Sequence, residues 1–189
     1  IKVVDALEIP PKNKVEEYCA LGQYGPSANE PGYAALEGVA KDSTTETFAA
    51  LKLRFENWRW AETPFYVRSG KRMGGKRTEV VVQFKPPAAN LFRKLPGFKH
   101  EPDLVPNRIV LEIAPKETFS MRLETKRPGQ GIMLDTLEMV ADVEDRFVFP
   151  VVEAYGPLIV DAMRGDQTLF KHRVEVERAW EAIMPFLGP

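Results

Sequence analysis

Residues that hold metals or disulfides are scarce in this sequence of 189 residues, which has one cysteine, Cys19, and two histidines, His100 and His172. One cysteine cannot form an internal disulfide or supply a cysteine-rich zinc site. The two histidines lie far apart in the sequence, so we predict no metal site. Few cysteines are typical of a reducing compartment, and we expect a cytoplasmic protein.

An excess of one charge and long apolar runs are also missing. Lysine and arginine number 26 and aspartate and glutamate 27, for a net charge of −1. This balance predicts neither nucleic acid nor a membrane as a partner. No apolar run approaches the roughly 20 residues of a membrane helix, and no signal peptide opens the chain. The length favours one domain, and a first residue other than Met suggests a piece of a longer protein.

The first forty residues predict an irregular surface segment. Pro10 and Pro11 break any early helix, and segments 24–26 and 30–33 have the composition of turns. An arm lying over the next element and a functional loop are equally consistent with this composition. The side chains expected to pack the segment are Tyr18, Tyr24 and Tyr33.

Six later segments alternate apolar and polar residues, which predicts strands with one buried and one wetter face. They are residues 45–56, 64–69, 78–85, 107–114, 118–125 and, more weakly, 133–143. Short links between some of them suit hairpins.

The last third of the chain has helical spacing instead. Apolar residues recur at i, i+3, i+4 and i+7 over 155–163, and the same spacing returns over 176–187. Gly165 predicts the end of the first helix, and Pro157 predicts a late start or a kink. Strands followed by helices indicate an α+β protein, with a large, mainly antiparallel sheet and helices packed on one face.

The densest chemical segment is 68–77, Arg-Ser-Gly-Lys-Arg-Met-Gly-Gly-Lys-Arg, which links two predicted strands. We call it the cationic segment. Lysine and arginine bind phosphate, and glycine lets a backbone approach a ligand closely. The composition fits an anion site and a solvated basic loop equally well. Its spacing matches neither the P-loop nor the dinucleotide fingerprint, and no βαβ unit with a glycine-rich turn is visible.

Other polar clusters are weaker candidates. Arg59 lies between Trp58 and Trp60 in the sequence, and packing of the cluster at a strand end explains it better than cation–π stacking does. Segments 125–129 and 170–173 are basic and predict solvated turns. His172 has no partner identifiable from the sequence, so we expect no catalytic role for it.

A series of motifs, in the same order, resembles the C-terminal domain of the glucose-6-phosphate dehydrogenase family. The resemblance covers nearly the whole chain. The motifs are Tyr24-Gly25-Pro26, Pro31-Gly32-Tyr33, 42–48, 57–60, 64–72, 78–80, Ala154-Tyr155, 158–166, Phe170 and Ala179-Trp180.

The resemblance implies an enzyme that oxidises glucose 6-phosphate to 6-phosphogluconolactone with NADP, in some members NAD, at the entry to the pentose phosphate pathway. Residues 1–189 would be its C-terminal domain. The family's N-terminal Rossmann-like domain, which binds most of the NADP, is absent from this chain. The implied partners are glucose 6-phosphate and a second copy, in a homodimer or a dimer of dimers formed through the sheet.

The resemblance also implies roles for two lysines. The lysine of the family's Arg-x-Gly-Lys motif contacts the sugar phosphate, and it is Lys71 here. A second basic residue five positions on joins it, and it is Lys76 here. Arg72 and Arg77 would be supporting charge at best. The family's catalytic histidine and its Asp-His-Tyr-Leu-Gly-Lys motif are absent, so we expect no catalytic and no cofactor-binding residue here, and no activity from the isolated chain.

Two departures and two alternatives accompany the resemblance. Ala114 stands where many members have Gln near the substrate, and Gly156-Pro157 interrupts a helix that is continuous elsewhere. The chain could instead be a non-catalytic assembly or allosteric partner of a dehydrogenase. A sugar-phosphate binding module is the third possibility.

Overall fold

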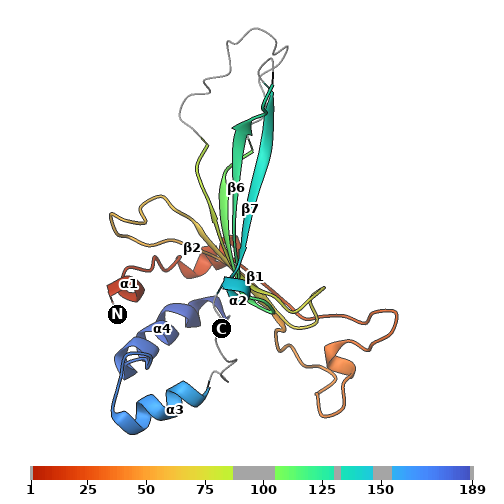
Figure 1. Cartoon of the computed structure of the whole chain (residues 1–189). Coiled ribbons are helices and arrows are strands. Elements are labelled where there is room, and N and C mark those ends of the chain that lie inside the picture. The colour runs from red at the N-terminus through yellow and green to blue at the C-terminus, as the bar shows by residue number, and fades with distance from the viewer. Residues whose placement is uncertain (1, 87–104, 130–132, 147–154, 188–189) are drawn as a thin grey trace. The chain divides into compact units, whose positions relative to one another are not determined.

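The computed structural model describes residues 2–86, 105–129, 133–146 and 155–187. The chain forms two compact units (Figure 1). Unit 1 comprises residues 1–73 and 152–189, and unit 2 comprises residues 74–151.

A three-stranded antiparallel sheet forms the centre of unit 1. Its strands are β1 (Cys19–Gly22), β2 (Phe48–Leu53) and β3 (Phe65–Gly70), in the order β1-β2-β3. Strands β2 and β3 confirm the predicted alternating segments. Phe65 at the start of β3 packs edge-to-face on Phe55 and Trp60, with centroids 4.9 and 5.2 Å apart. Such aromatic contacts fix the end of the sheet.

The expectation of an irregular first forty residues was wrong in part. Besides β1, these residues form the short helix α1 (Lys2–Asp5) and the 3₁₀ helices η1 (Lys12–Glu17) and η2 (Tyr33–Ala35). Strand β1 has four residues, too few to show a clear alternation.

Two helices and a 3₁₀ turn complete unit 1. They are α3 (Tyr155–Arg164), α4 (Arg173–Ile183) and η3 (Met184–Phe186). Gly165 ends α3 with φ +73°, as predicted. The helix begins at Tyr155, so the late start was not observed. Pro157 lies in the first turn, where the missing N–H would have had no helical acceptor.

The most buried side chains of the described residues all belong to unit 1. Phe186 is 1% exposed, Ala182 6% and Leu53 9%. The Cys19 thiol donates a hydrogen bond of 3.4 Å to the Phe186 carbonyl, and η3 contacts η1. The C-terminal turn therefore closes the small core against β1.

Unit 2 contains a four-stranded antiparallel sheet in sequence order. Its strands are β4 (Thr78–Gln83), β5 (Arg108–Ala114), β6 (Thr118–Lys126) and β7 (Leu134–Asp142), and the short helix α2 (Val143–Arg146) follows. All four confirm predicted strands. Figure 1 shows β6 and β7 as long neighbouring arrows, and their register is continuous over nine residue pairs.

One face of the unit 2 sheet is apolar. The register places Val80 beside Leu111, which pairs with Phe119, and the next row has the same character. Val80, Leu111 and Phe119 are 37–48% exposed. The prediction of one buried face is therefore wrong for unit 2 within the described residues, because a single layer has no second layer to pack against. The apolar face consists of Val80, Val82, Ile109, Leu111, Phe119, Met121, Leu123, Leu137, Met139 and Ala141.

The predicted α+β class is confirmed. The strands divide into sheets of three and four strands, whereas we had expected one large sheet. No helix in the described part of the chain is long and apolar enough to span a membrane.

Candidate functional site: two Lys-Arg doublets

The cationic segment begins inside strand β3 and ends immediately before strand β4. It carries two Lys-Arg doublets: the first is Lys71-Arg72 and the second is Lys76-Arg77. The first lies in unit 1 and the second in unit 2. Each doublet has its own surroundings.

The arginine of the first doublet is held by two side chains of the N-terminal region. Arg72 forms an ion pair with Glu30, and its guanidinium lies 5.8 Å from the centre of the Tyr24 ring. Arg72 has φ +54°, in the left-handed region that residues other than glycine seldom occupy. Both charged side chains are about half-exposed, so their pairing has a modest effect on stability.

The backbone of Lys71 is fixed by Thr47, the residue before strand β2. The Lys71 N–H donates to the Thr47 carbonyl at 2.8 Å, and Thr47 Oγ1 accepts the Tyr24 N–H at 2.9 Å. The Thr47 N–H donates to the Gly22 carbonyl at 2.8 Å. Thr47 thus connects Lys71 to the N-terminal region through three hydrogen bonds.

Close packing also restricts the residue before the first doublet. A Cβ at Gly70 would lie 2.9 Å from both Phe48 Cδ2 and Met73 Sδ. Phe48 is the cross-strand partner of Gly70. A larger residue here would force the Phe48 ring or the Met73 side chain to move, because both lie in the space that its Cβ would take.

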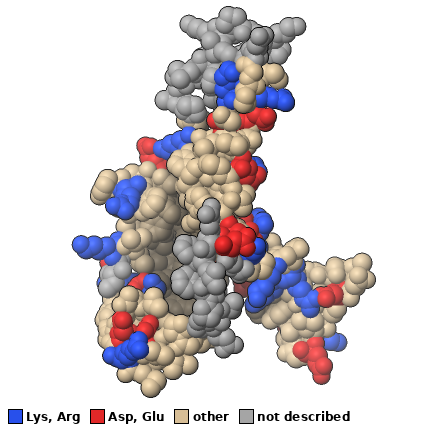
Figure 2. Space-filling model, viewed as in Figure 1, with Lys and Arg blue, Asp and Glu red and all other residues tan. Residues whose placement is uncertain are grey.

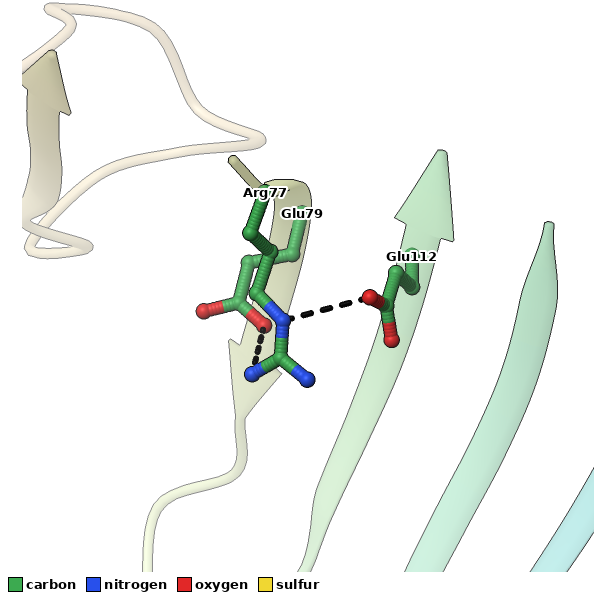
Figure 3. A network of polar contacts seen from close by, with 3 residues as sticks. All are labelled: Arg77, Glu79 and Glu112. Carbon is green, nitrogen blue, oxygen red and sulfur yellow. Dashed lines mark hydrogen bonds and ion pairs between the residues drawn. The ribbon is translucent and has the colours of Figure 1, made fainter. Parts of the chain in front are cut away.

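The arginine of the second doublet is held by two carboxylates of the unit 2 sheet (Figure 3). Arg77 Nε is 3.2 Å from Glu112 Oε1, and an Arg77 Nη is 3.5 Å from Glu79 Oε2. Glu79 and Glu112 are cross-strand partners on β4 and β5. Two carboxylates placed opposite each other repel, so the guanidinium between them offsets a like-charge pair.

The two lysines differ from their arginine neighbours. Within the described part of the chain, neither Lys71 nor Lys76 has a side-chain ion pair or hydrogen bond. Arg68, on β3, likewise has no side-chain ion pair or hydrogen bond with the described residues. In each doublet the arginine is therefore neutralised by carboxylates, and the lysine ammonium remains available to an anion.

Charge elsewhere is more evenly mixed. In Figure 2 acidic and basic side chains are interspersed over the visible described surface. Among the described residues, no group of three or more His, Cys, Asp and Glu side chains could hold a metal ion.

The other sequence candidates have structural roles where the structure describes them. Arg59 lies over the exposed Trp58 ring at 5.8 Å, so the structure shows the stacking that we had placed second to packing at a strand end. His172 caps helix α4, since its Nδ1 accepts the Val174 N–H at 3.2 Å. Histidine is not a preferred N-cap residue, so this role had little signal in the sequence. His100 lies outside the described residues.

Ala114, the departure from the family pattern, lies close to the second doublet. It is the cross-strand partner of Thr78, two residues after Lys76. Its methyl group neither donates nor accepts a hydrogen bond.

These features define an α+β domain with a cationic segment that links strands β3 and β4. The family model for "Glucose-6-phosphate dehydrogenase, C-terminal domain" matches residues 1–188. The glucose-6-phosphate 1-dehydrogenase of Mycolicibacterium smegmatis is 39% identical over 98% of this chain, and that of Bacillus subtilis is 38% identical over 97%. The chain spans 37% of the length of both relatives.

Solved structures agree. A structure described as glucose-6-phosphate dehydrogenase in complex with its substrate glucose-6-phosphate superposes with a TM-score of 0.85 and 29% identity, over 100% of this chain and 38% of that one. The Mycobacterium avium enzyme gives a TM-score of 0.75 and 32% identity, over 98% and 36%. The chain therefore belongs to the glucose-6-phosphate dehydrogenase family and corresponds to its C-terminal domain.

Proposed function

We propose that this domain binds the substrate phosphate in a cytoplasmic, NADP-dependent glucose-6-phosphate dehydrogenase. The reaction oxidises glucose 6-phosphate to 6-phosphogluconolactone at the entry to the pentose phosphate pathway. In this proposal Lys71 and Lys76 contact the phosphate, and Arg72 and Arg77 hold the chain on either side. The family membership and the cationic segment support the assignment.

One observation carries the assignment of the lysines. Both arginines are paired with carboxylates, whereas both lysine ammonium groups lack a partner among the described residues. An ammonium with no internal partner binds phosphate without first breaking an ion pair, and a lysine serves well as a point charge for phosphate. The solvated-loop alternative does not require the arginines to be anchored.

The chemical step belongs to another part of the enzyme in this proposal. The histidine that removes the hydroxyl proton and most of the NADP contacts would lie in the N-terminal domain. NADP bound there would supply the hydride acceptor. This chain's contribution is to bind and orient the phosphate end of the sugar, which brings the reacting carbon to the cofactor. The isolated chain is expected to be inactive.

The test is a Lys71→Ala variant of the full-length protein that carries this domain. Loss of a charge-assisted phosphate contact is expected to raise KM for glucose 6-phosphate by about tenfold or more. KM for NADP should stay near its wild-type value. Lys14→Ala, at an exposed lysine of η1, is the matched control.

Unchanged KM and kcat in Lys71→Ala would refute the phosphate role. No turnover by the unmodified full-length protein would favour the alternative of a non-catalytic assembly or allosteric partner.

We further propose that a second copy covers the apolar face of the unit 2 sheet, in a homodimer or a dimer of dimers. Val80 and Val81 offer a matched test, because they are 48% and 46% exposed and lie on opposite faces of β4. Burying a charge at an interface is strongly unfavourable. Val80→Glu should dissociate the oligomer in sedimentation velocity, and Val81→Glu should not. Equal behaviour of both variants would place the interface elsewhere.

A further inference from the structure

The N-terminal segment 22–36, here called the arm, is ordered by its own contacts. The Tyr33 N–H donates to the Tyr24 carbonyl at 3.1 Å, and the two rings pack edge-to-face with centroids 5.8 Å apart. A Cβ at Gly32 would lie 3.0 Å from the Pro26 nitrogen, so the two sides of the arm touch. The arm is therefore a folded element with a defined shape.

This arm is attached on both sides of the Lys71 α-carbon. On one side, the Lys71 N–H is bound by Thr47, whose hydroxyl accepts the Tyr24 N–H. On the other side, Arg72 is paired with Glu30 and stacked on Tyr24. The Lys71 side chain forms no hydrogen bond or ion pair with the described residues, the arm included. Its backbone is fixed, whereas its ammonium has no such partner among them.

We propose that the arm is a positioning element for Lys71, with Glu30 and Thr47 as positioning residues for substrate binding. The inference rests on the proposed contact between Lys71 and the substrate phosphate. Fixing the backbone on both sides sets the direction in which the lysine side chain leaves the chain. A lysine has four rotatable side-chain bonds, so a fixed starting direction reduces the conformations lost when phosphate binds.

The Glu30–Arg72 pair has a second consequence. The left-handed backbone at Arg72 is unfavourable for this residue and persists only where surrounding contacts impose it. The ion pair and the Tyr24 stack are such contacts. Without them, residues 71 and 72 should relax toward a commoner conformation, and the Lys71 side chain would start from a different direction.

The competing explanation is that Arg72 binds phosphate itself. Exchanging the charges of residues 30 and 72 distinguishes the two explanations. If Arg72 acts through Glu30, the variant Glu30→Arg/Arg72→Glu retains an ion pair of reversed direction. If Arg72 binds phosphate, the exchange places a carboxylate in the anion site and cannot restore binding.

The experiment measures steady-state kinetics in the full-length protein. Glu30→Gln and Arg72→Glu should each raise KM for glucose 6-phosphate about three- to tenfold, with kcat and KM for NADP nearly unchanged, since misplacement of a binding group weakens binding. The exchanged pair should recover KM to within about threefold of wild type, because its coupling energy is restored. Glu177→Gln, which removes the exposed Arg173–Glu177 pair on α4, should change nothing.

A second pair of variants guards against poor folding of the charge variants. Thr47→Ser keeps the hydroxyl that accepts the Tyr24 N–H, and Thr47→Val removes it. Thr47→Val should raise KM for glucose 6-phosphate, and Thr47→Ser should not. Equal KM values in the two would overturn the role of Thr47.

The two proposals fail in different ways. If Lys71→Ala raises KM but Glu30→Gln and Thr47→Val do not, the phosphate contact stands and the arm is only structural. If Lys71→Ala has no effect, the phosphate contact itself is wrong. In a Lys71→Ala background, Glu30→Gln should add no further increase in KM, and a full additional increase would show that the arm acts independently of Lys71.

Discussion

The two Lys-Arg doublets share a dipeptide but are anchored in different ways. Arg77 is bound by carboxylates that face each other across paired strands, so its anchor follows from the sheet register. Arg72 is bound by Glu30 and Tyr24, which belong to an arm between β1 and β2. In both doublets the lysine has no ion-pair partner among the described residues, but the arginine is held by paired strands in unit 2 and by the arm in unit 1.

This difference determines how each doublet should respond to substitution. A sheet holds the backbone near Arg77 even when one carboxylate is lost, because the ladder of main-chain hydrogen bonds remains. The backbone at Arg72 depends on a few contacts with the arm. The first doublet should consequently be more sensitive to substitutions outside the cationic segment.

The largest effect is expected when the two lysines are removed together. Lys71→Ala and Lys76→Ala should each raise KM for glucose 6-phosphate about tenfold or more, and the double variant should raise it further. Steady-state kinetics of the full-length protein provides the measurement. A normal KM for Lys76→Ala would mean that only the first doublet binds substrate.

Alanine substitutions should show that Gly70, before the first doublet, is more tightly packed than Gly75, before the second. Gly70→Ala should lower the free energy of unfolding by about 1–3 kcal/mol, because the new methyl group overlaps Phe48 and Met73. A Cβ at Gly75, in the same segment, would have no neighbouring atom within 4 Å. Gly75→Ala should change stability by no more than about 0.5 kcal/mol. Denaturant unfolding compares them, and equal losses would contradict the packing argument.

A smaller effect is expected at the anchor of the second doublet. Arg77→Ala leaves Glu79 and Glu112 facing each other and should cost up to about 1 kcal/mol at low salt. The Glu79→Gln/Glu112→Gln double variant removes both the pairing and the repulsion, so its stability should stay closer to wild type. Added salt should reduce the loss in Arg77→Ala. A larger loss in the double variant would show that repulsion between the carboxylates is unimportant.

The smallest effect concerns the ion pair between Lys171 and Glu175 at the start of α4, which serves as a reference for both doublets. The Lys171 ammonium, hydrogen-bonded to Glu175 at the start of α4, lowers the pKa of that carboxyl. A lowered pKa in the folded state stabilises the fold above the unfolded pKa, and this contribution disappears as the pH falls through the folded value. Lys171→Ala should raise the pKa of Glu175 in an NMR titration. An unchanged pKa of Glu175 in this variant would show that Lys171 does not cause the lowered value.

The sequence predicted most of the strands and helices because their signals are local. Alternation along 118–125 and 133–143 is visible without knowledge of any partner, and it predicted β6 and β7. Helical spacing and Gly165 predicted α3 and its end. Strand β1 was missed because four residues carry too little periodicity. The division into two sheets depends on which strands pair, and alternation contains no such information.

The candidate site was predictable in its composition and not in its anchoring. The roles of Lys71 and Lys76 came from the cationic segment and the family resemblance, and they remain predictions. Of the three tyrosines expected to pack the first forty residues, Tyr18, Tyr24 and Tyr33, the last two contact each other edge-to-face. The contact of Arg72 with Glu30 was not expected, because it joins two exposed charges far apart in the sequence.

The hydrogen bond between Cys19 and Phe186 makes the reactivity of the Cys19 thiol a measure of local opening in unit 1. Partial burial, with a smaller contribution from Glu46, raises the pKa of the Cys19 thiol and slows its reaction with alkylating reagents. The thiol is the only one in the sequence, and its acceptor lies in the last described turn. Release of that turn would break this hydrogen bond and expose the sulfur further, so the alkylation rate of Cys19 would report how often η3 detaches from β1.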